Sequence, residues 1–551
     1  MRSTLVALLL ALCLAAAACT NAQTPPPLVA SPMPSPPAAA APPPTVPAAA
    51  QPAPTGGIVV ASPAWAKDLV LYQVFVRSFA DGNGDGVGDL KGITQRLDYI
   101  QSLGASALWL TPIFASPSYH GYDTADYYAI NPQFGTPEDL AELTREAHKR
   151  GIKVILDFVA GHTSNQHPFF KEAYGHPGAP HSEFYRWQDG RQTQYASFPG
   201  APDLPSLNHS SPAVQQYLID VAKHWLDLNG DGDVTDDIDG YRLDYALGVP
   251  HDFWKRFRQE VKAVNPNAIL LGEVWTGNAL EIKPFFDNEF DAAFDFPLYG
   301  TLEGSPDRTG DGVLNGQASA ALIAFDLGAA DRVYPPGAVR VGFINNHDTN
   351  RVASEVGGSL DRAKTAASLL FTLPNPPMIY YGEEIGMAGT KGGVGVWDMT
   401  RREPMDWYAA GRGQGMPTWF QGPNNTANDG VSVQEEDGKA GSLLEHYRAL
   451  GRLRRESGAL RGGDHEEVRV EGNDKVYALV RRAPEDTMLG VFNFGDGPAN
   501  VTLDLGQTTL GNATYSVTDA LSGAALPDLN GATYTAQLPA AGSLLLRLKA
   551  K

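Results

Sequence analysis

The segment Ile152-Lys153-Val154-Ile155-Leu156-Asp157-Phe158 is an apolar, β-branched run with a carboxylate, Asp157, next to its end. Short runs of this kind predict buried parallel strands. Eight such runs precede residue 382: Val70–Val76, Ala105–Leu110, Ile152–Phe158, Asp239–Asp244, Ala268–Val274, Phe290–Phe296, Val339–Asn345 and Met378–Tyr381. Helix-like stretches such as Pro137–Arg150 and Pro212–Leu228 separate several of them. Eight strands that alternate with helices predict an α/β fold, a (β/α)8 TIM barrel.

Two further domains are predicted around this barrel, which we place at residues 63–460. About 80 residues separate the third and fourth runs, which is too long for one helical connection. Within this gap, residues 162–208 are rich in Pro, His, Gly and aromatics and are predicted to form an inserted domain at the barrel mouth. Residues 461–551 are predicted to form an antiparallel β-sandwich. Its expected strands are Val468–Val470, Val476–Arg481, Met488–Asn493, Val501–Leu505, Tyr515–Val517 and Leu544–Leu548.

Composition excludes several classes of protein. The 551 residues include 42 Lys and Arg against 62 Asp and Glu, a net charge of −20. Such acidity argues against a nucleic-acid partner, because phosphate neutralisation needs clustered basic residues. The only cysteines are Cys13 and Cys19. The folded body therefore contains no disulfide, no Cys-ligated zinc and no cysteine nucleophile.

The first 62 residues indicate export and a tether. Residues 1–18 combine Arg2 with an apolar run and are predicted to be a signal peptide. Cys19 follows three alanines and resembles a bacterial lipoprotein cleavage site; ordinary secretory cleavage near Ala22 is the alternative. Residues 19–62 form a Pro/Ala-rich linker that favours extended polyproline II. We expect an exported cell-envelope lipoprotein, or otherwise a secreted or periplasmic protein, that meets the membrane only through lipid on Cys19.

Polar residues stand where several of the strand-like runs end. The active site of a TIM barrel lies at the C-terminal ends of its strands. We therefore expect the polar residues at four of these strand ends to lie together at the mouth of the barrel. They are Asp157, Arg242, Asp244, Glu273, His347 and Asp348. Crowding like charges costs energy, so a set of structural salt bridges is a poor explanation for them.

This set of residues suits glycoside hydrolysis, which needs one carboxylate as nucleophile or base and one carboxylic acid. Arg242 and Asp244 share one face of their strand, and a neighbouring guanidinium favours the ionised, nucleophilic form of Asp244. Glu273 is the candidate acid, with its pKa raised by the adjacent carboxylates and partial burial. We expect Asp348 and His347 to bind sugar hydroxyls and to stabilise an oxocarbenium-like state.

In this order, the four segments resemble the sequence regions of glycoside hydrolase family 13, the α-amylase family. The resemblance implies retention of configuration, with Asp244 as nucleophile, Glu273 as acid/base and Asp348 as transition-state stabiliser. It implies that Arg242 is the partner of Asp244. Further residues that it assigns to substrate binding are His120, Tyr122, Asp123, Asp157, His162, His347 and Arg402, with Tyr122 stacking on the sugar and Arg402 facing Asp123 near the substrate.

Three departures separate the chain from typical α-amylases. Gly161 stands where many of them place a calcium-binding Asn, which puts their interdomain calcium in doubt here. After the nucleophile comes Tyr245-Ala246-Leu247-Gly248 instead of Ala-x-Lys-His. The segment Pro205-Ser206-Leu207-Asn208 resembles both the oligo-1,6-glucosidase and the neopullulanase versions of a fifth region without matching either. The chain thus resembles the group intermediate between those two subfamilies.

Two loops predict Ca²⁺ as cofactor. The loop of Asp81, Asn83, Asp85, Val87 and Asp89 has the EF-hand ligand spacing with Gly86 at position 6, and lacks only the final Glu. Hard oxygen ligands on a tight loop suit calcium, and a plain Asx-rich turn is the alternative. The same spacing recurs more weakly in a second loop, and weaker still in Asp307–Asp311. The second loop comprises Asp227, Asn229, Asp231 and Asp233.

The sequence therefore predicts a monomeric, endo-acting α-amylase that cleaves α-1,4 bonds in starch and related α-glucans. An exo-acting α-glucosidase, an oligo-1,6-glucosidase and a neopullulanase- or cyclomaltodextrinase-like enzyme are the alternatives. A non-catalytic glucan-binding lipoprotein is a more remote one, since fold alone does not fix function. Stacking on sugar faces is a further expectation for the aromatics Trp187, Tyr195, Phe198, Trp275 and Trp419, for each of which core packing is the alternative.

Overall fold

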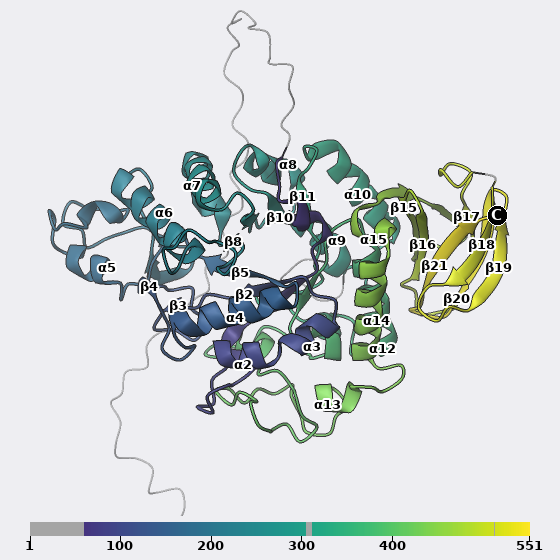
Figure 1. The fold of residues 1–551 in the computed structure, drawn as a ribbon, viewed down its shortest axis with the longest axis horizontal. Helices are drawn as coiled ribbons and strands as arrows, with labels where there is room; N and C mark the ends of the chain where they lie inside the picture. The colour runs from purple at the N-terminus through teal and green to yellow at the C-terminus, as the bar shows by residue number, and fades with distance from the viewer. Residues whose placement is uncertain (1–59, 305–310, 512) are drawn as a thin grey trace, which may run out of the picture. The chain divides into compact units, whose positions relative to one another are not determined.

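The structure is a computed structural model that describes residues 60–304, 311–511 and 513–551 (Figure 1). The predicted signal peptide, Cys19, nearly all of the predicted linker and most of the Asp307–Asp311 loop lie outside the described residues. Within the described ranges, no helix has the length and apolar character needed to cross a membrane.

Eight parallel strands form the central sheet, and each falls within one of the predicted runs. They are β1 (Leu71–Val74), β2 (Ala107–Leu110), β5 (Lys153–Phe158), β8 (Gly240–Leu243), β9 (Ile269–Gly272), β10 (Ala292–Phe294), β11 (Val339–Val341) and β12 (Met378–Tyr380). Their order is β11-β10-β9-β8-β5-β2-β1-β12. A parallel bridge between Gly342 and Pro377 joins the two ends of this order. The sheet therefore closes into the predicted barrel.

The strands are apolar throughout because both of their faces are buried. Alternate residues point to opposite faces of a strand. Inward-facing side chains such as Leu71, Ile155 and Leu271 form one cluster inside the barrel, while outward-facing neighbours such as Tyr72 and Leu270 pack in the layer beneath the helices. This two-sided burial explains why the runs show no polar alternation.

Helices lie around the strands (Figure 1). The two predicted ones begin at favourable N-caps: Thr136 forms a capping box with Asp139, and the Ser211 side chain accepts from two backbone amides. The helices of this region are α1 (Val76–Phe79), α2 (Leu90–Gln95), α3 (Leu97–Ser102), α4 (Pro137–Lys149), α6 (Pro212–Leu226), α7 (His251–Val264), α8 (Ala279–Ile282), α9 (Phe296–Glu303), α10 (Ala321–Val333), α11 (Val352–Glu355), α12 (Leu360–Thr372), α13 (Val433–Glu436), α14 (Leu443–Glu456) and α15 (Gly458–Gly462).

The connections after the second and third barrel strands carry extra structure. A hairpin of β3 (Phe114–Ala115) and β4 (Asp126–Ile130) follows β2. Between β5 and α6 lie α5 (Pro168–Ala173) and a second hairpin, β6 (Ser197–Phe198) with β7 (Ala201–Pro205). The excursion predicted after the third strand is therefore present.

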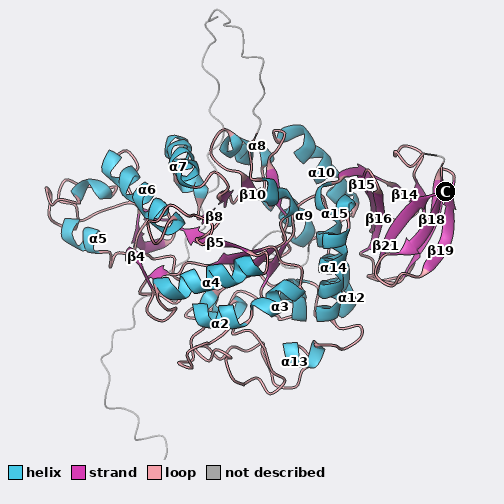
Figure 2. Ribbon diagram, viewed as in Figure 1, coloured by secondary structure: helices cyan, strands magenta, loops and turns pink. Residues whose placement is uncertain are grey.

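The C-terminal region consists of two antiparallel sheets (Figure 2). One has the order β13-β15-β16-β21-β18-β19 and the other β14-β17-β20. Their apolar faces share one core that includes Val480, Leu489 and Leu503. The strands are β13 (Asp464–Glu467), β14 (Arg469–Glu471), β15 (Val476–Ala483), β16 (Asp486–Asn493), β17 (Ala499–Asp504), β18 (Thr514–Asp519), β19 (Ala525–Asn530), β20 (Thr533–Leu538) and β21 (Ser543–Ala550).

The predicted sandwich is confirmed, but three of its strands were not predicted: β13, β19 and β20. All three lie at sheet edges. Edge strands are partly exposed and need no apolar run, so polar segments such as Asp464–Glu467 give no strand signal. The sandwich is fastened to the barrel by buried Arg481, which donates hydrogen bonds to the carbonyls of Thr372 (2.7 Å) and Leu373 (2.6 Å).

Candidate active site

A cavity of about 740 Å³ lies at the C-terminal ends of the barrel strands. All three predicted catalytic carboxylates line it: Asp244 directly after β8, Glu273 directly after β9, and Asp348 in the loop after β11. Four of the predicted substrate-binding residues, His120, Tyr122, His162 and Arg402, line it as well. The others, Asp123, Asp157, Arg242 and His347, are buried and do not line the cavity.

The buried guanidinium of Arg242 joins three carboxylates. Its Nη1 donates to Asp157 (2.9 Å) and Asp244 (2.7 Å), and its Nη2 donates to Glu273. The side chain is 1% exposed and its charge lies 4.9 Å from the centre of the Trp109 ring. In this low-dielectric setting the guanidinium offsets part of the repulsion between the carboxylates. The group thereby holds Asp244 and Glu273 on one wall of the cavity.

Local backbone geometry explains the Gly-x-Arg-x-Asp pattern of β8. Gly240 has φ +139°, and a Cβ at this position would lie 2.1 Å from the carbonyl oxygen of Ile269 on β9. Only glycine allows the two strands to approach so closely. Directly after Asp244, Tyr245 has a left-handed φ of +42°, and its amide donates to Glu273 Oε2 at 2.9 Å.

The environments of Glu273 and Asp348 push their pKa values in opposite directions. Burial raises the pKa of Glu273 to about 8, against the opposing effect of Arg242. Burial would also raise the pKa of Asp348, but His347, Arg402 and Arg242 outweigh it and hold that pKa well below its usual range. Such divergence between two carboxyl groups marks one as a proton donor and the other as a fixed anion near neutral pH.

Asp348 is held on both carboxylate oxygens, by the Arg402 guanidinium and by the buried imidazole of His347. Arg402 Nη2 donates to Oδ1 at 2.6 Å, and His347 Nε2 lies 2.9 Å from Oδ2. Arg402 Nε also donates to the backbone carbonyl of His347 at 2.8 Å. The Asp348 side chain is 29% exposed, so its ionised carboxylate faces the cavity.

Beneath the cavity, Tyr122, His347 and Asp157 form a hydrogen-bonded layer that includes two residues missed from the sequence. The Tyr122 hydroxyl contacts Asp157 Oδ2 (2.9 Å) and His347 Nε2 (2.6 Å). Gln73 on β1 bonds His347 Nδ1 at 2.7 Å, and the Trp109 indole on β2 donates to Asp157 at 3.1 Å. Both residues lie inside predicted strands. A polar side chain in the middle of an apolar run was the available signal for Gln73, and Trp109 gives no signal of its own.

The expected pairing of Arg402 with Asp123 is wrong. Asp123 is 5% exposed and accepts hydrogen bonds from the hydroxyls of Ser116 and Ser118, and His120 lies 3.9 Å from it. Arg402 instead pairs with Asp348 and, at 3.5 Å, with Asp398. The reason is local. The hydroxyls of Ser116 and Ser118 satisfy the Asp123 carboxylate, and the Arg402 guanidinium binds the carboxylates of Asp348 and Asp398.

Of the five aromatics considered for sugar stacking, two line the cavity: Phe198 from the insertion and Trp275 after β9. Trp187 and Tyr195 pack against Phe170 within the insertion. Trp419 stacks on Tyr119 at a centroid distance of 5.6 Å and donates to the Ser78 hydroxyl. The remaining wall includes Lys391, Trp397 and Asp398, which were not predicted.

The Asp81 loop follows α1 and adopts a series of tight turns. Asp81 accepts from the amides of Gly84 (2.6 Å) and Gly86 (2.8 Å), and Asp89 caps α2 by accepting from Gly92 (2.7 Å). The Asp227 loop makes similar turns. Nowhere in the described residues do three or more His, Cys, Asp or Glu side chains form a group arranged to hold a metal ion.

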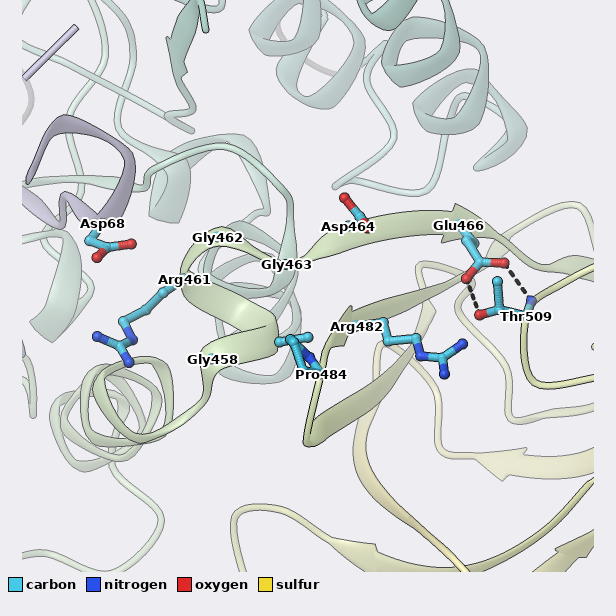
Figure 3. Close-up of a pocket in the computed structure, with 11 residues that line it drawn as sticks. Asp68, Gly458, Arg461, Gly462, Gly463, Asp464, Glu466, Arg482, Pro484 and Thr509 are labelled. Carbon is cyan, nitrogen blue, oxygen red and sulfur yellow. Dashed lines mark hydrogen bonds between the residues drawn. The ribbon is translucent and has the colours of Figure 1, made fainter. Parts of the chain in front are cut away.

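A separate cavity of about 590 Å³ lies between the barrel and the C-terminal sheets, near Asp68 at the N-terminal end of β1 (Figure 3). Its two cationic side chains, Arg461 and Arg482, point in opposite directions. The Glu466 carboxylate accepts a hydrogen bond from the Thr509 amide. None of the described residues that line it is aromatic. It therefore lacks both a stacking surface for a sugar and a convergent charge for an anion.

Comparison with protein families identifies the group to which this site belongs. The profile described as "Alpha amylase, catalytic domain" matches residues 73–463, which span every strand-end residue described above. The chain belongs to the α-amylase family. It is thus a glycoside hydrolase of family 13, with the barrel and C-terminal sandwich typical of that family.

Relatives in the α-amylase family are similar over most of their length. The chain is 35% identical to "Alpha-amylase 3" of Dictyoglomus thermophilum over 453 residues, covering 78% of this chain and 85% of the relative. It is 32% identical to "Neopullulanase 2" of Thermoactinomyces vulgaris, covering 79% and 70%. Among solved structures, the α-amylase from H. orenii superposes with a TM-score of 0.74 at 31% identity, covering 88% of this chain and all of that one.

Replacing Arg242 by Met should destabilise the fold in a pH-dependent way. Without the guanidinium, the pKa values of Asp157 and Glu273 rise further, because Arg242 is what opposes the effect of burial on both. The folded state then binds more protons than before, so its stability falls as pH increases. We expect a loss of about 3–5 kcal/mol at pH 8 and a smaller loss at pH 5.5, measured by chemical denaturation at both pH values.

The matched control is Arg150→Met, which removes a guanidinium paired with the exposed carboxylate of Asp98. Its effect should be small at both pH values because exposed ion pairs contribute little. An equal loss of stability at pH 5.5 and pH 8 for Arg242→Met would contradict the charge-balancing role.

Proposed function

We propose that the protein is an endo-acting α-amylase that hydrolyses α-1,4-glucosidic bonds in starch and maltodextrins with retention of configuration. The observation that carries the proposal is the pair of carboxyl groups, Asp244 and Glu273, bonded to the two terminal nitrogens of one guanidinium. Retaining glycosidases need their nucleophile and acid at short range, and a shared guanidinium imposes this. The leader sequence supports action outside the cytoplasm, tethered through Cys19.

The proposed reaction is a double displacement. Asp244 attacks the anomeric carbon while protonated Glu273 gives its proton to the departing glycosidic oxygen, which leaves a covalent glucosyl–Asp244 intermediate. Glu273 then takes a proton from water, whose oxygen attacks the same carbon and releases Asp244. The ionised carboxylate of Asp348 stabilises the positive charge that develops on the sugar ring in both steps.

The open form of the site supports endo action. The insertion contributes only His162, Phe198, Ala201 and Leu204 to the cavity wall, and an excursion of this size leaves the cleft accessible to a long chain. The similarity to "Alpha-amylase 3" of Dictyoglomus thermophilum favours the same activity. The similarity to "Neopullulanase 2" supports a neopullulanase-like specificity as the second candidate.

Asp244→Asn and Glu273→Gln should each lower kcat for starch by at least about 10³-fold, because each removes a group that reacts in the transition state. Release of reducing ends from starch measures this, with thermal unfolding as a check on the fold. Asp203→Asn is the matched control, since Asp203 is exposed on β7 and does not line the cavity. Starch hydrolysis by either catalytic variant at the parent rate would refute the proposal.

Product lengths should separate the two modes of attack. An endo-acting enzyme is expected to release a spread of oligosaccharides from long amylose at early times, and an exo-acting one releases glucose alone. A time course on amylose, pullulan and cyclodextrin measures this. Preferential cleavage of pullulan or cyclodextrin would favour the neopullulanase-like alternative.

We also propose, from the ligand spacing in the sequence, that the Asp81 loop binds calcium through Asp81, Asn83, Asp85, Asp89 and the backbone carbonyl of Val87. The three carboxylates do not form a ready metal-binding group in the structure, so the proposal requires the loop to close around the ion. All these donors are hard oxygens, as calcium prefers. The amide bonds to Asp81 and Asp89 leave further lone pairs free on each carboxylate. Burial raises the pKa of Asp89, a cost of ionisation that a bound cation would offset.

Chelation should therefore lower the unfolding temperature, and added Ca²⁺ should restore it, because a ligand that binds only the folded state stabilises it. Differential scanning fluorimetry with EDTA and with Ca²⁺ measures the shift. Asp85→Asn should abolish the shift, since it removes a charged ligand. Asp85 is exposed, and the Asn oxygen can keep the hydrogen bond from the Val87 amide. Asp231→Asn, in the second loop, should leave the shift in place if the Asp81 loop is the calcium site. An unfolding temperature that EDTA does not change would refute calcium binding.

A further inference from the structure

One wall of the cavity is built by residues 389–398, a glycine-rich segment between β12 and Arg402. Four of its ten residues are glycine, at positions 389, 392, 393 and 395. Its side chains at the cavity are Lys391, Trp397 and Asp398. None of them takes part in the bond-breaking steps described above.

Trp397 is held in a conformation that tryptophan rarely adopts. Its φ is +40°, in the left-handed region where a Cβ is strained. Two hydrogen bonds fix it there: the Gly392 amide donates to the Trp397 carbonyl at 2.6 Å, and the Trp397 amide donates to the Gly393 carbonyl at 3.0 Å. Strain of this kind persists where the surrounding structure imposes it, and it is concentrated at functional sites.

The Trp397 indole gains little from core packing. All nine tryptophans of the chain are described, and Trp397 is the one that is mainly solvent-exposed, at 54%. Trp109, Trp225 and Trp254 are fully buried. Trp397 is an exposed indole in a strained loop and forms part of the wall of a cavity large enough for a carbohydrate. Such a ring is a surface for stacking on a sugar.

Ion pairs place this wall on the Asp348 side of the cavity. Asp398 pairs with Arg401 and, at 3.5 Å, with Arg402, which itself holds Asp348. Tyr245 and Trp275, in contrast, adjoin Asp244 and Glu273 along the chain. Because Glu273 protonates the leaving group, residues beside it face the leaving-group side, and the wall at Asp398 faces the non-reducing side.

We propose that Trp397 stacks on a glucosyl unit two or three positions from the cleaved bond on the non-reducing side, and so selects substrates with an extended glycone. Lys391 lies on the same wall, and its backbone amide donates to Asn350. Its ammonium forms no ion pair or hydrogen bond with the described residues, which leaves it for sugar hydroxyls. This inference rests on the proposed glycosidase function and adds a specificity-determining residue to it.

Fluoride release from α-glucosyl fluoride and α-maltotriosyl fluoride tests the proposal. Both substrates have the same small leaving group, but only the second reaches beyond the cleaved sugar on the non-reducing side. Trp397→Gly should lower kcat/KM for the trisaccharide fluoride about 10-fold and leave that for glucosyl fluoride within about 2-fold. Trp397→Phe, which keeps a ring, should retain most of the trisaccharide rate.

Two controls separate stacking from loop damage. Glycine accepts a left-handed φ, so Trp397→Gly should unfold at the parent temperature or above it. Val394→Gly alters an exposed residue of the same loop that does not line the cavity and should leave both rates unchanged. Equal losses on both substrates, or no loss on the trisaccharide fluoride, would overturn the role of Trp397. A parent protein inactive on both fluorides would overturn the glycosidase assignment and this inference with it.

Discussion

The contacts of the Arg242 guanidinium are the constraint on which the rest of the site depends. One buried cation serves Asp157, Asp244 and Glu273, so the group keeps a net negative charge in a water-poor setting. Burial then raises the pKa of Glu273 to about 8. Asp348 escapes the same effect because Arg402 and His347 each bond one of its oxygens, and its pKa is lowered. Unequal sharing of cations thus gives neighbouring carboxylates different protonation states.

The barrel supports this arrangement by bringing together residues that are far apart in the chain. Asp157 lies at the end of β5, Asp244 and Glu273 directly follow β8 and β9, and Asp348 lies in the loop after β11. Parallel strands end at one face of a barrel. Trp109 and Gln73, from two further strands, complete the layer below. Because three of the four carboxylates lie at strand ends, the sheet sets most of the geometry, and Arg402 and His347 hold the fourth, Asp348.

Strands and strand-end residues could be predicted from the hydrophobic pattern of the sequence, and residues placed by loop geometry could not. Strands buried on both faces gave apolar runs, and their ends gave the catalytic carboxylates directly. The partner of Arg402 was wrong because several carboxylates lie within its reach, and their competition is decided in three dimensions. Trp397 was missed because its segment has no periodic pattern. The edge strands β13, β19 and β20 were missed because edge positions tolerate polar sequences.

The close approach of β8 and β9 at Gly240 limits how this site can evolve. With no room for a Cβ beside Ile269, the position two residues before Arg242 cannot drift, although glycine contributes no functional group there. Specificity can diversify only outward, in the loops that carry Phe198 and Trp397. A directed-evolution library for new glucan preferences should therefore vary those loops and leave β8 untouched.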